Sequence, residues 1–206
     1  TLPELTALLR DALRTPTGNM TLFPVQAVAL SELHDNDGAF CPIDVGEGKA
    51  LTSLLAGVVA KAYRPVLFVP AKLRDQTERD VIPKMAHHWR LHRNLRIYSY
   101  EMLSSPKSAL LLDELDPDLV ILDEAHALKN SQAARTKRFL RFMKAHPKTK
   151  LVALSGTMTS KSLFDFWELC KLALPGFKCP MPLHFSILRD WDAAIGAGAS
   201  WAHNEP

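Results

Sequence analysis

Short apolar runs alternate along the chain with longer segments in which apolar residues recur at helical spacing. Apolar runs bounded by turn residues are typical of buried strands, and they lie at residues 39–44, 65–69, 95–100, 118–123 and 150–155. Helical spacing is found at residues 3–14, 24–35, 49–62, 72–90, 107–114, 131–145 and 162–172. The pattern therefore predicts a series of βα units.

Continuous apolar strands separated by helices indicate a mostly parallel sheet with helices on both faces. We therefore expect a three-layer α/β domain. Ligands of such sheets bind beyond the carboxyl ends of the strands. The polar motifs of this chain fall at the predicted ends, at residues 44–49, 70–72, 123–126 and 155–157.

The length of 206 residues and the hydrophobic content of 47% suffice for one sizeable core. We assign that core to a domain at residues 1–175, because the pattern weakens from Gly176 onward. The glycine-rich stretch at 196–200 predicts a flexible tail, with Trp191 and Trp201 as its large side chains. The extension at 176–206 either packs loosely or contacts a further domain.

Composition sets broad limits on location and partners. The net charge of +3 permits a nucleic-acid partner without requiring one. Cys41, Cys170 and Cys179 form no C-x-x-C pair, which favours a reducing compartment. The longest apolar stretch, residues 51–60, is far shorter than the roughly 20 residues of a membrane span. We expect no membrane partner and a cytoplasmic location, or a nuclear one in a eukaryote; a chain opening at Thr1 is either processed or part of something longer.

A glycine-rich turn joins the first predicted strand to the next helix and contains Gly46, Gly48 and Lys49. Small residues let backbone N–H groups surround a polyphosphate, the helix start adds its positive end, and a lysine reaches the outer phosphates. Two positions depart from G-x-x-x-x-G-K-[ST]: Ile43 replaces the first glycine and Ala50 replaces the hydroxyl that ligates magnesium. A purely structural strand-to-helix turn remains an alternative.

An acidic pair ends the apolar run at residues 119–122. At the carboxyl end of a buried strand, Asp123 can bind hydrated Mg²⁺ and Glu124 can polarise an attacking water. The alternative is that the two acids simply begin a solvated helix, where acids favour the first turn. The glycine-lysine turn upstream makes the magnesium site the stronger interpretation.

These motifs resemble, in order, those of superfamily 2 helicases, and among them the Swi/Snf-like translocases of the DEAH type. Phe23-Pro24-Val25-Gln26 resembles the adenine-reading segment, and the Gly46–Lys49 turn resembles motif I. The stretches that resemble motifs Ia, Ib, II and III are residues 66–81, 97–103, 123–130 and 155–175. The resemblance covers about residues 20–175.

The resemblance implies the first of two RecA-like P-loop lobes that clamp ATP and move along a nucleic acid; the second lobe has no counterpart in the sequence. It implies Glu124 and Lys49 as catalytic residues and Asp123 as the Mg²⁺ residue, acting through water. It implies that ATP is bound by Phe23, Gln26 (on the adenine), Val45, Gly46, Glu47, Gly48, Lys49, Ala50 and Leu51. Coupling to the strand and the second lobe would use His126, Ser155 and Thr157, although a helix-capping turn is the alternative for the last two. Nucleic-acid contacts would come from Lys72 and Tyr100.

Departures from the family pattern bear on activity. Met158 stands for a proline and Lys161 for an asparagine, both tolerable in a loop. Ala50 lacks the side-chain hydroxyl that normally ligates magnesium. Thr52 cannot replace it, because a step of two residues along a helix turns the side chain about 200° away from the phosphates. We expect an ATPase that acts as a translocase directed at double-stranded DNA, with weakened Mg²⁺ affinity and with hydrolysis that is slow or absent in the isolated lobe. The alternatives are a nucleotide-sensing or scaffold module without turnover and an RNA or single-strand helicase.

Two clusters of cations remain ambiguous in the sequence. Residues 129–150 contain eight lysines and arginines and no acid, which indicates either a solvated helix face or a phosphate-binding patch. Residues 84–96 mix cations with His87, His88 and His92. A helix that ends in a surface loop explains this cluster better than a metal site, because no carboxylate or cysteine completes a ligand set.

Overall fold

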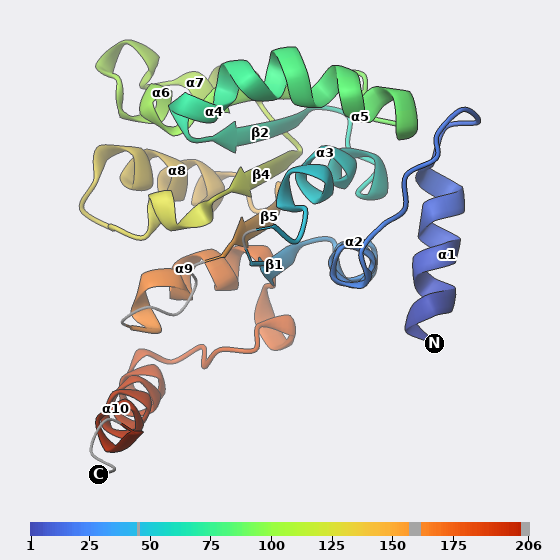
Figure 1. Cartoon of the computed structure of the whole chain (residues 1–206). Helices are drawn as coiled ribbons and strands as arrows, with labels where there is room; N and C mark the ends of the chain where they lie inside the picture. Colours follow the sequence, from blue (N-terminus) through green and yellow to red (C-terminus); the bar gives the residue numbers. More distant parts are fainter. Residues whose placement is uncertain (45, 157–161, 203–206) are drawn as a thin grey trace.

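Five strands form one parallel sheet in the computed structural model, which describes residues 1–44, 46–156 and 162–202, with side chains to residue 195 (Figure 1). The order across the sheet is β1-β5-β4-β2-β3. All four neighbouring pairs are parallel. The strands are β1 (Ala39–Pro42), β2 (Pro65–Val69), β3 (Arg96–Ser99), β4 (Leu119–Asp123) and β5 (Lys150–Ser155).

Helices cover both faces of this sheet, which confirms the predicted three-layer α/β architecture. One face packs against α6 (Tyr100–Ser104), α7 (Leu111–Leu115), α8 (Ala134–Ala145) and α9 (Phe164–Ala173). The other packs against α2 (Pro24–Asn36), α3 (Lys49–Val59) and the helical stretch α4 (Ala71–Gln76), η1 (Thr77–Val81) and α5 (Ile82–His88), whose middle segment η1 is π-helical.

The strands are apolar throughout because both of their faces are buried. In β2, Val66 and Phe68 face the α8 layer, whereas Leu67 and Val69 face the α3 layer. This alternation is the two-residue period of a strand. Since neighbouring strands are parallel, all of their carboxyl ends meet at one edge of the sheet and their amino ends at the other.

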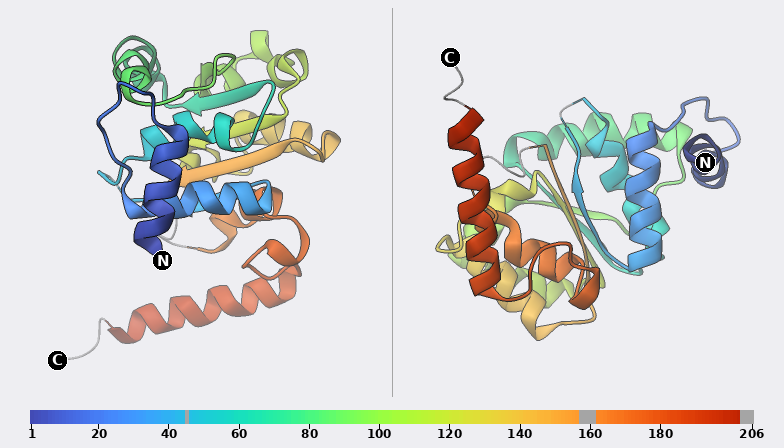
Figure 2. Two further views of the ribbon diagram at one scale, coloured as in Figure 1. Left: turned by 90° about the vertical axis from the view of Figure 1, so that its right-hand side faces the viewer. Right: turned by 90° about the horizontal axis from the view of Figure 1, so that it is seen from below.

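The N-terminal helix α1 (Leu2–Leu13) lies outside α2 and closes a small third cluster of buried side chains (Figure 2). Trp89, which is 1% exposed, lies at the centre of that cluster. Beside it, His88 Nδ1 accepts a hydrogen bond from the backbone N–H of Asn19, and His92 Nε2 contacts the carbonyl of Ala62. Across the described part of the chain no group of three or more His, Cys, Asp or Glu residues could bind a metal ion.

Two segments differ from the prediction. The expected helix at 107–114 is divided, because Pro106 opens the short 3-10 turn η2 (Pro106–Ser108) and α7 starts only at Leu111. The tail contains a helix, α10 (Phe185–Ala202), where the sequence pattern predicted none. No helix within the described ranges is both long and apolar enough to cross a membrane.

The first half of α10 packs against the fold near α9. Leu188 is fully buried, and Phe185 packs against Phe164 and Trp167. The carboxylate of Asp192 accepts a hydrogen bond of 2.6 Å from the backbone N–H of Leu163. In Figures 1 and 2, α10 lies away from the sheet, on the opposite side from α1 and α2.

Candidate nucleotide-binding site

The glycine turn lies at the carboxyl edge of the sheet, between β1 and α3 (Figure 1). Gly46 and Gly48 both have positive φ, at 94° and 75°. A Cβ on Gly48 would overlap the side-chain amide nitrogen of Gln26, whereas a Cβ on Gly46 would meet no atom of the described residues within 4 Å. The turn therefore packs closely on one side and is open on the other. Gly48 caps α3, whose amino end directs unbonded N–H groups outward.

Lys49 is the first residue of α3 and is only 8% exposed. Its Nζ donates to the carbonyl oxygen of Ile43 at 3.2 Å and forms an ion pair with Glu124 Oε1 at 3.2 Å. A buried ammonium needs such partners, because an uncompensated charge is costly away from water. Phosphate oxygens at the open side of the turn could take over this role.

Asp123 ends β4 and is 9% exposed, and its Oδ1 has no hydrogen-bond partner among the described residues. Burial and, to a smaller extent, the neighbouring charge of Glu124 raise the pKa of this carboxyl to about 6, although the positive charge of Lys49 opposes the shift. A carboxylate oxygen is a preferred ligand of Mg²⁺ and of its water shell. The unpartnered oxygen therefore fits a hydrated magnesium ion.

Glu124 adopts the left-handed conformation, with φ 57° and ψ 54°. This backbone costs about 1–2 kcal/mol for a residue with a Cβ, and such strain is common at functional sites. Its second oxygen, Oε2, lies 3.3 Å from His126 Nδ1, which is also 3.2 Å from Ser155 Oγ. The expected coupling residues His126 and Ser155 thus link the acidic end of β4 to the end of β5. Thr157 and Val45 lie outside the described residues.

Gln26 connects α2 to the turn and is 2% exposed. Its Oε1 accepts from the backbone N–H of Phe23 at 2.7 Å, and its Nε2 donates to the carbonyl of Gly48 at 2.9 Å. Phe23 itself is 48% exposed beside the turn. The sequence did not reveal this support of the turn by Gln26. Adenine recognition by Phe23 and Gln26 stays a prediction.

The remaining residues expected to bind ATP differ in orientation. Glu47 and Ala50 are exposed, whereas Leu51 is 7% exposed in the cluster around Trp89. Only the backbone of Leu51 is therefore available to a phosphate. Thr52 is buried, and its hydroxyl has no partner within the described ranges.

The structure corrects the expected role of Tyr100. Its side chain is 1% exposed, so it cannot lie against a nucleic acid. Its hydroxyl donates to the carbonyl of Asp123 at 2.8 Å, and burial raises its pKa well above the usual value. Tyr100 therefore supports the end of β4 from inside. Lys72 is exposed at the start of α4, beyond the end of β2.

Several cations of the basic run at 129–150 form ion pairs or hydrogen bonds within the fold. Lys150 pairs with Asp37, Arg141 pairs with Asp113 at 2.9 Å, and Lys144 lies 3.9 Å from Glu168. Arg138 donates to the carbonyls of Leu103 and Ser105. These contacts favour the interpretation as a solvated, internally paired helix face.

Two known proteins are similar in sequence to parts of this chain. Chromodomain-helicase-DNA-binding protein 1 of Gallus gallus is 28% identical over 149 residues, which are 69% of this chain and 8% of that protein. Chromatin-remodeling ATPase INO80 of Eremothecium gossypii is 35% identical over 82 residues, which are 40% of this chain and 5% of that protein. The chain thus spans less than a tenth of either relative.

A solved structure has the same fold. The Sulfolobus solfataricus SWI2/SNF2 ATPase core in complex with dsDNA matches with a TM-score of 0.56 and 23% identity, over 78% of this chain and 37% of that one. This likeness confirms the RecA-like fold. The model of the SNF2-related domain matches residues 62–195, a range that includes Asp123 and Glu124 but begins after the glycine turn. Because the match covers more than half of the sequence, the chain belongs to the SNF2-related domain family.

Proposed function

We propose that the chain is the ATP-binding lobe of a helicase-like, ATP-dependent translocase that acts on double-stranded DNA. The observation that carries this proposal is the contact between the glycine turn and the acidic strand end. Lys49 Nζ lies 3.2 Å from Glu124 Oε1, and the unpartnered carboxylate oxygen of Asp123 belongs to the neighbouring residue. A cation, a hydrated-metal site and a base for water are what phosphoryl transfer requires.

ATP would bind at the amino end of α3. Backbone N–H groups of the turn would surround the phosphates, and Lys49 would exchange Glu124 for the outer phosphates. This exchange would leave the carboxylate of Glu124 free to orient and polarise the attacking water. Phe23 and Gln26 lie beside the turn, where they would meet the base.

Asp123 would hold Mg²⁺ through a water molecule, and the bound ion would neutralise charge on the phosphates. Tyr100 positions Asp123 from below, through the hydrogen bond to its carbonyl. The contact between His126 and Ser155 would transmit the change between the ATP-bound and ATP-free states from the end of β4 to the end of β5.

Two partners complete this proposal. A second RecA-like lobe, in cis or in trans, would close over the nucleotide, which agrees with the 37% of the solved ATPase core that this chain covers. Double-stranded DNA would be the track, because that ATPase core was solved in complex with dsDNA, and Lys72 is available at the same edge of the sheet.

Phosphate release from Mg-ATP tests the proposal, measured on the full gene product alone and with duplex DNA, single-stranded DNA or RNA. We expect stimulation by duplex DNA and its loss in Glu124→Gln. Stimulation by RNA or single strands alone would identify a helicase of another type. Turnover that survives in Glu124→Gln would contradict the assigned base.

Ala50 supports a second candidate, a sensing or scaffold module that binds ATP without turnover. The side chain at this position is exposed at the first turn of α3 and has no hydroxyl, and Thr52 is buried. If the missing hydroxyl limits hydrolysis, Ala50→Thr lowers the Mg²⁺ concentration needed for half-maximal ATP binding or turnover. An unchanged Mg²⁺ titration in Ala50→Thr would remove this idea.

A further inference from the structure

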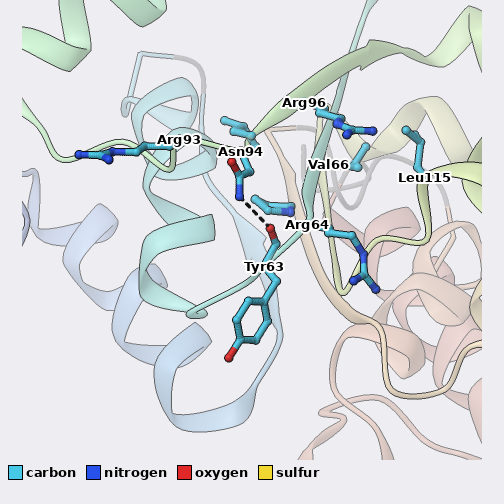
Figure 3. Close-up of a pocket in the computed structure, with 9 residues that line it drawn as sticks. Tyr63, Arg64, Val66, Arg93, Asn94, Arg96 and Leu115 are labelled. Atoms are coloured by element: carbon cyan, nitrogen blue, oxygen red, sulfur yellow. Dashed lines mark hydrogen bonds between the residues drawn. The ribbon is translucent and has the colours of Figure 1, made fainter.

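A hollow of about 500 Å³ opens at the amino edge of the sheet, far from the glycine turn (Figure 3). It lies where β2 and β3 begin, beside the end of α7. Its size is in the range of small-ligand sites. The lining residues that matter here are Tyr63, Arg64, Val66, Arg93, Asn94 and Arg96.

The charge of this hollow is positive and incompletely compensated. Arg93 and Arg96 are exposed, and neither forms an ion pair with any residue that the structure describes. Arg64 pairs with Asp116 at 2.8 Å, but that pair is itself largely exposed. Guanidinium groups present planar pairs of donors that match phosphate oxygens. The hollow therefore suits a phosphate-bearing ligand.

The arrangement of the cations indicates an extended ligand. In Figure 3, Arg93 points to one side of Tyr63 and Asn94, while Arg64 and Arg96 lie on the other side. A single phosphate ion would need donors that converge on one point. A second hollow of about 620 Å³ shares Tyr63, Arg93 and Asn94 with the first and adds the cations Lys61 and Arg90. The two hollows form one basic trough.

An aromatic residue, Tyr63, lines both hollows of this trough. Tyr63 is 78% exposed, although its backbone is fixed: its N–H donates to Asp118 at 2.6 Å and its carbonyl accepts from Asn94 at 3.4 Å. An exposed aromatic ring between arginines is a stacking platform for an unpaired base. An acidic peptide carries carboxylates but no base that could stack on this ring, and in a duplex the bases are already stacked on one another.

We propose that the basic trough binds a single nucleic-acid strand, with phosphates on Arg93 and Arg96 and an unpaired base on Tyr63. This site lies at the edge of the sheet opposite the ATP site and needs no nucleotide there. Its ligand class is a phosphodiester strand of either sugar. The proposal does not rest on the proposed translocase activity.

Fluorescence anisotropy of a labelled oligothymidylate of about twelve nucleotides, a length within known single-strand site sizes, tests the site in the absence of ATP. Arg93→Gln/Arg96→Gln should weaken binding by roughly tenfold and reduce the slope of log K against log salt by about 1.4, or 0.7 for each lost phosphate contact. Tyr63→Ser should weaken oligonucleotide binding by at least about fivefold, and Tyr63→Phe should retain it. Inorganic tripolyphosphate should bind weakly, and equally in both Tyr63 variants.

Lys129→Gln/Lys137→Gln is the matched control, since both lysines are exposed and without an ion pair among the described residues. Unchanged oligonucleotide affinity in the arginine variant, or an equal loss in the control, would overturn the proposal. So would tighter, arginine-dependent binding of poly-glutamate or of a duplex of the same length. Lys72→Gln tests whether the oligonucleotide binds at the carboxyl edge instead. If this variant loses oligonucleotide binding and the arginine variant does not, the strand binds at the carboxyl edge. Thermal melting verifies that each variant folds.

Discussion

At the carboxyl edge of the sheet, the charged side chains of the candidate site, Lys49, Asp123 and Glu124, are largely buried. Lys49 and Glu124 pair at 3.2 Å, with side-chain exposures of 9% and 22%. At the amino edge, the pair of Arg64 and Asp116 has exposures of 55% and 62%, and Arg93 is exposed beside it. The two ends of the same strands thus place charge in very different environments.

The difference follows from how each edge is built. The glycine turn folds over the end of β1 and brings Lys49 against the end of β4, so its partners are fixed and desolvated. The starts of β2 and β3 carry arginines whose long side chains extend into water. On ligand binding, Lys49 at the first edge would have to exchange its partner, whereas Arg93 and Arg96 at the second edge would bind an anion without breaking an ion pair of the described residues. Substitutions should have large effects at the first edge and small effects at the second.

The largest effect is expected from Glu124→Gln. Removing the base should lower DNA-stimulated phosphate release by about 10²-fold or more. Because the substitution also removes the partner of Lys49, ATP binding should be retained or become tighter. A fluorescent ATP analogue measures binding in parallel with phosphate release. Lost ATP binding in Glu124→Gln would show that the ion pair positions Lys49 rather than competing with phosphate.

Asp123→Asn tests how strongly the carboxyl edge disfavours charge. The folded-state pKa of Asp123 is about 6, against 3.8 for an unperturbed carboxyl. Between these values the folded state binds a proton that the unfolded state does not, so the free energy of unfolding falls as pH rises from about 4 to 6. The penalty is complete above pH 6 and amounts to about 3 kcal/mol.

In the absence of metal, Asp123→Asn should therefore be more stable than the wild type at pH 7.5, and the gap should close as pH falls towards 4. Thermal unfolding across this pH range, without nucleotide or Mg²⁺, measures the difference. Asp118→Asn is a useful control, because its carboxylate at the other edge accepts hydrogen bonds from two backbone N–H groups. A pH-independent gap for Asp123→Asn would contradict the raised pKa.

Gly48→Ala and Gly46→Ala compare the closed and open sides of the glycine turn. Both glycines have positive φ, so each alanine carries backbone strain of about 1–2 kcal/mol, partly offset by lower entropy of the unfolded chain. Gly48→Ala also displaces the amide of Gln26 and loses its hydrogen bond, about 1 kcal/mol more. We expect a loss of about 2 kcal/mol for Gly48→Ala and about 1 kcal/mol for Gly46→Ala in the free energy of unfolding, measured with denaturant. Equal losses would show that Gln26 does not support the turn.

The sequence predicted the sheet well because buried parallel strands are continuous apolar runs. The run at 65–69 matches β2, and 150–155 matches β5. The α10 helix was missed because Gly196 and Gly198 lower helix propensity, and the contacts of Phe185 and Leu188 with the rest of the fold are tertiary.

The chemistry of the candidate site could be predicted, but not its internal contacts. Lys49 and Glu124 were expected near the same edge, yet their ion pair depends on how the turn folds over β4. Tyr100 was placed at a surface because burial at the junction of β3 and α6 leaves no local pattern. The cluster at 84–96, which includes Arg93 and Arg96, was interpreted as a helix that ends in a surface loop. Arg64 was not connected with it, because Arg64 and Arg96 come together only when β2 pairs with β3.

The smallest effect is expected from Asp116→Asn at the amino edge. Its ion pair with Arg64 is exposed, and such pairs contribute less than about 1 kcal/mol. Asp116 has a left-handed backbone (φ 41°), which asparagine adopts readily, so the free energy of unfolding should change by no more than about 0.5 kcal/mol. Because Arg64 loses its acid, oligonucleotide binding should strengthen slightly while ATP binding stays unchanged. A large loss of stability in Asp116→Asn would show that the exposed pair of Arg64 and Asp116 is important for folding. That result would contradict the expectation that substitutions at the amino edge have small effects.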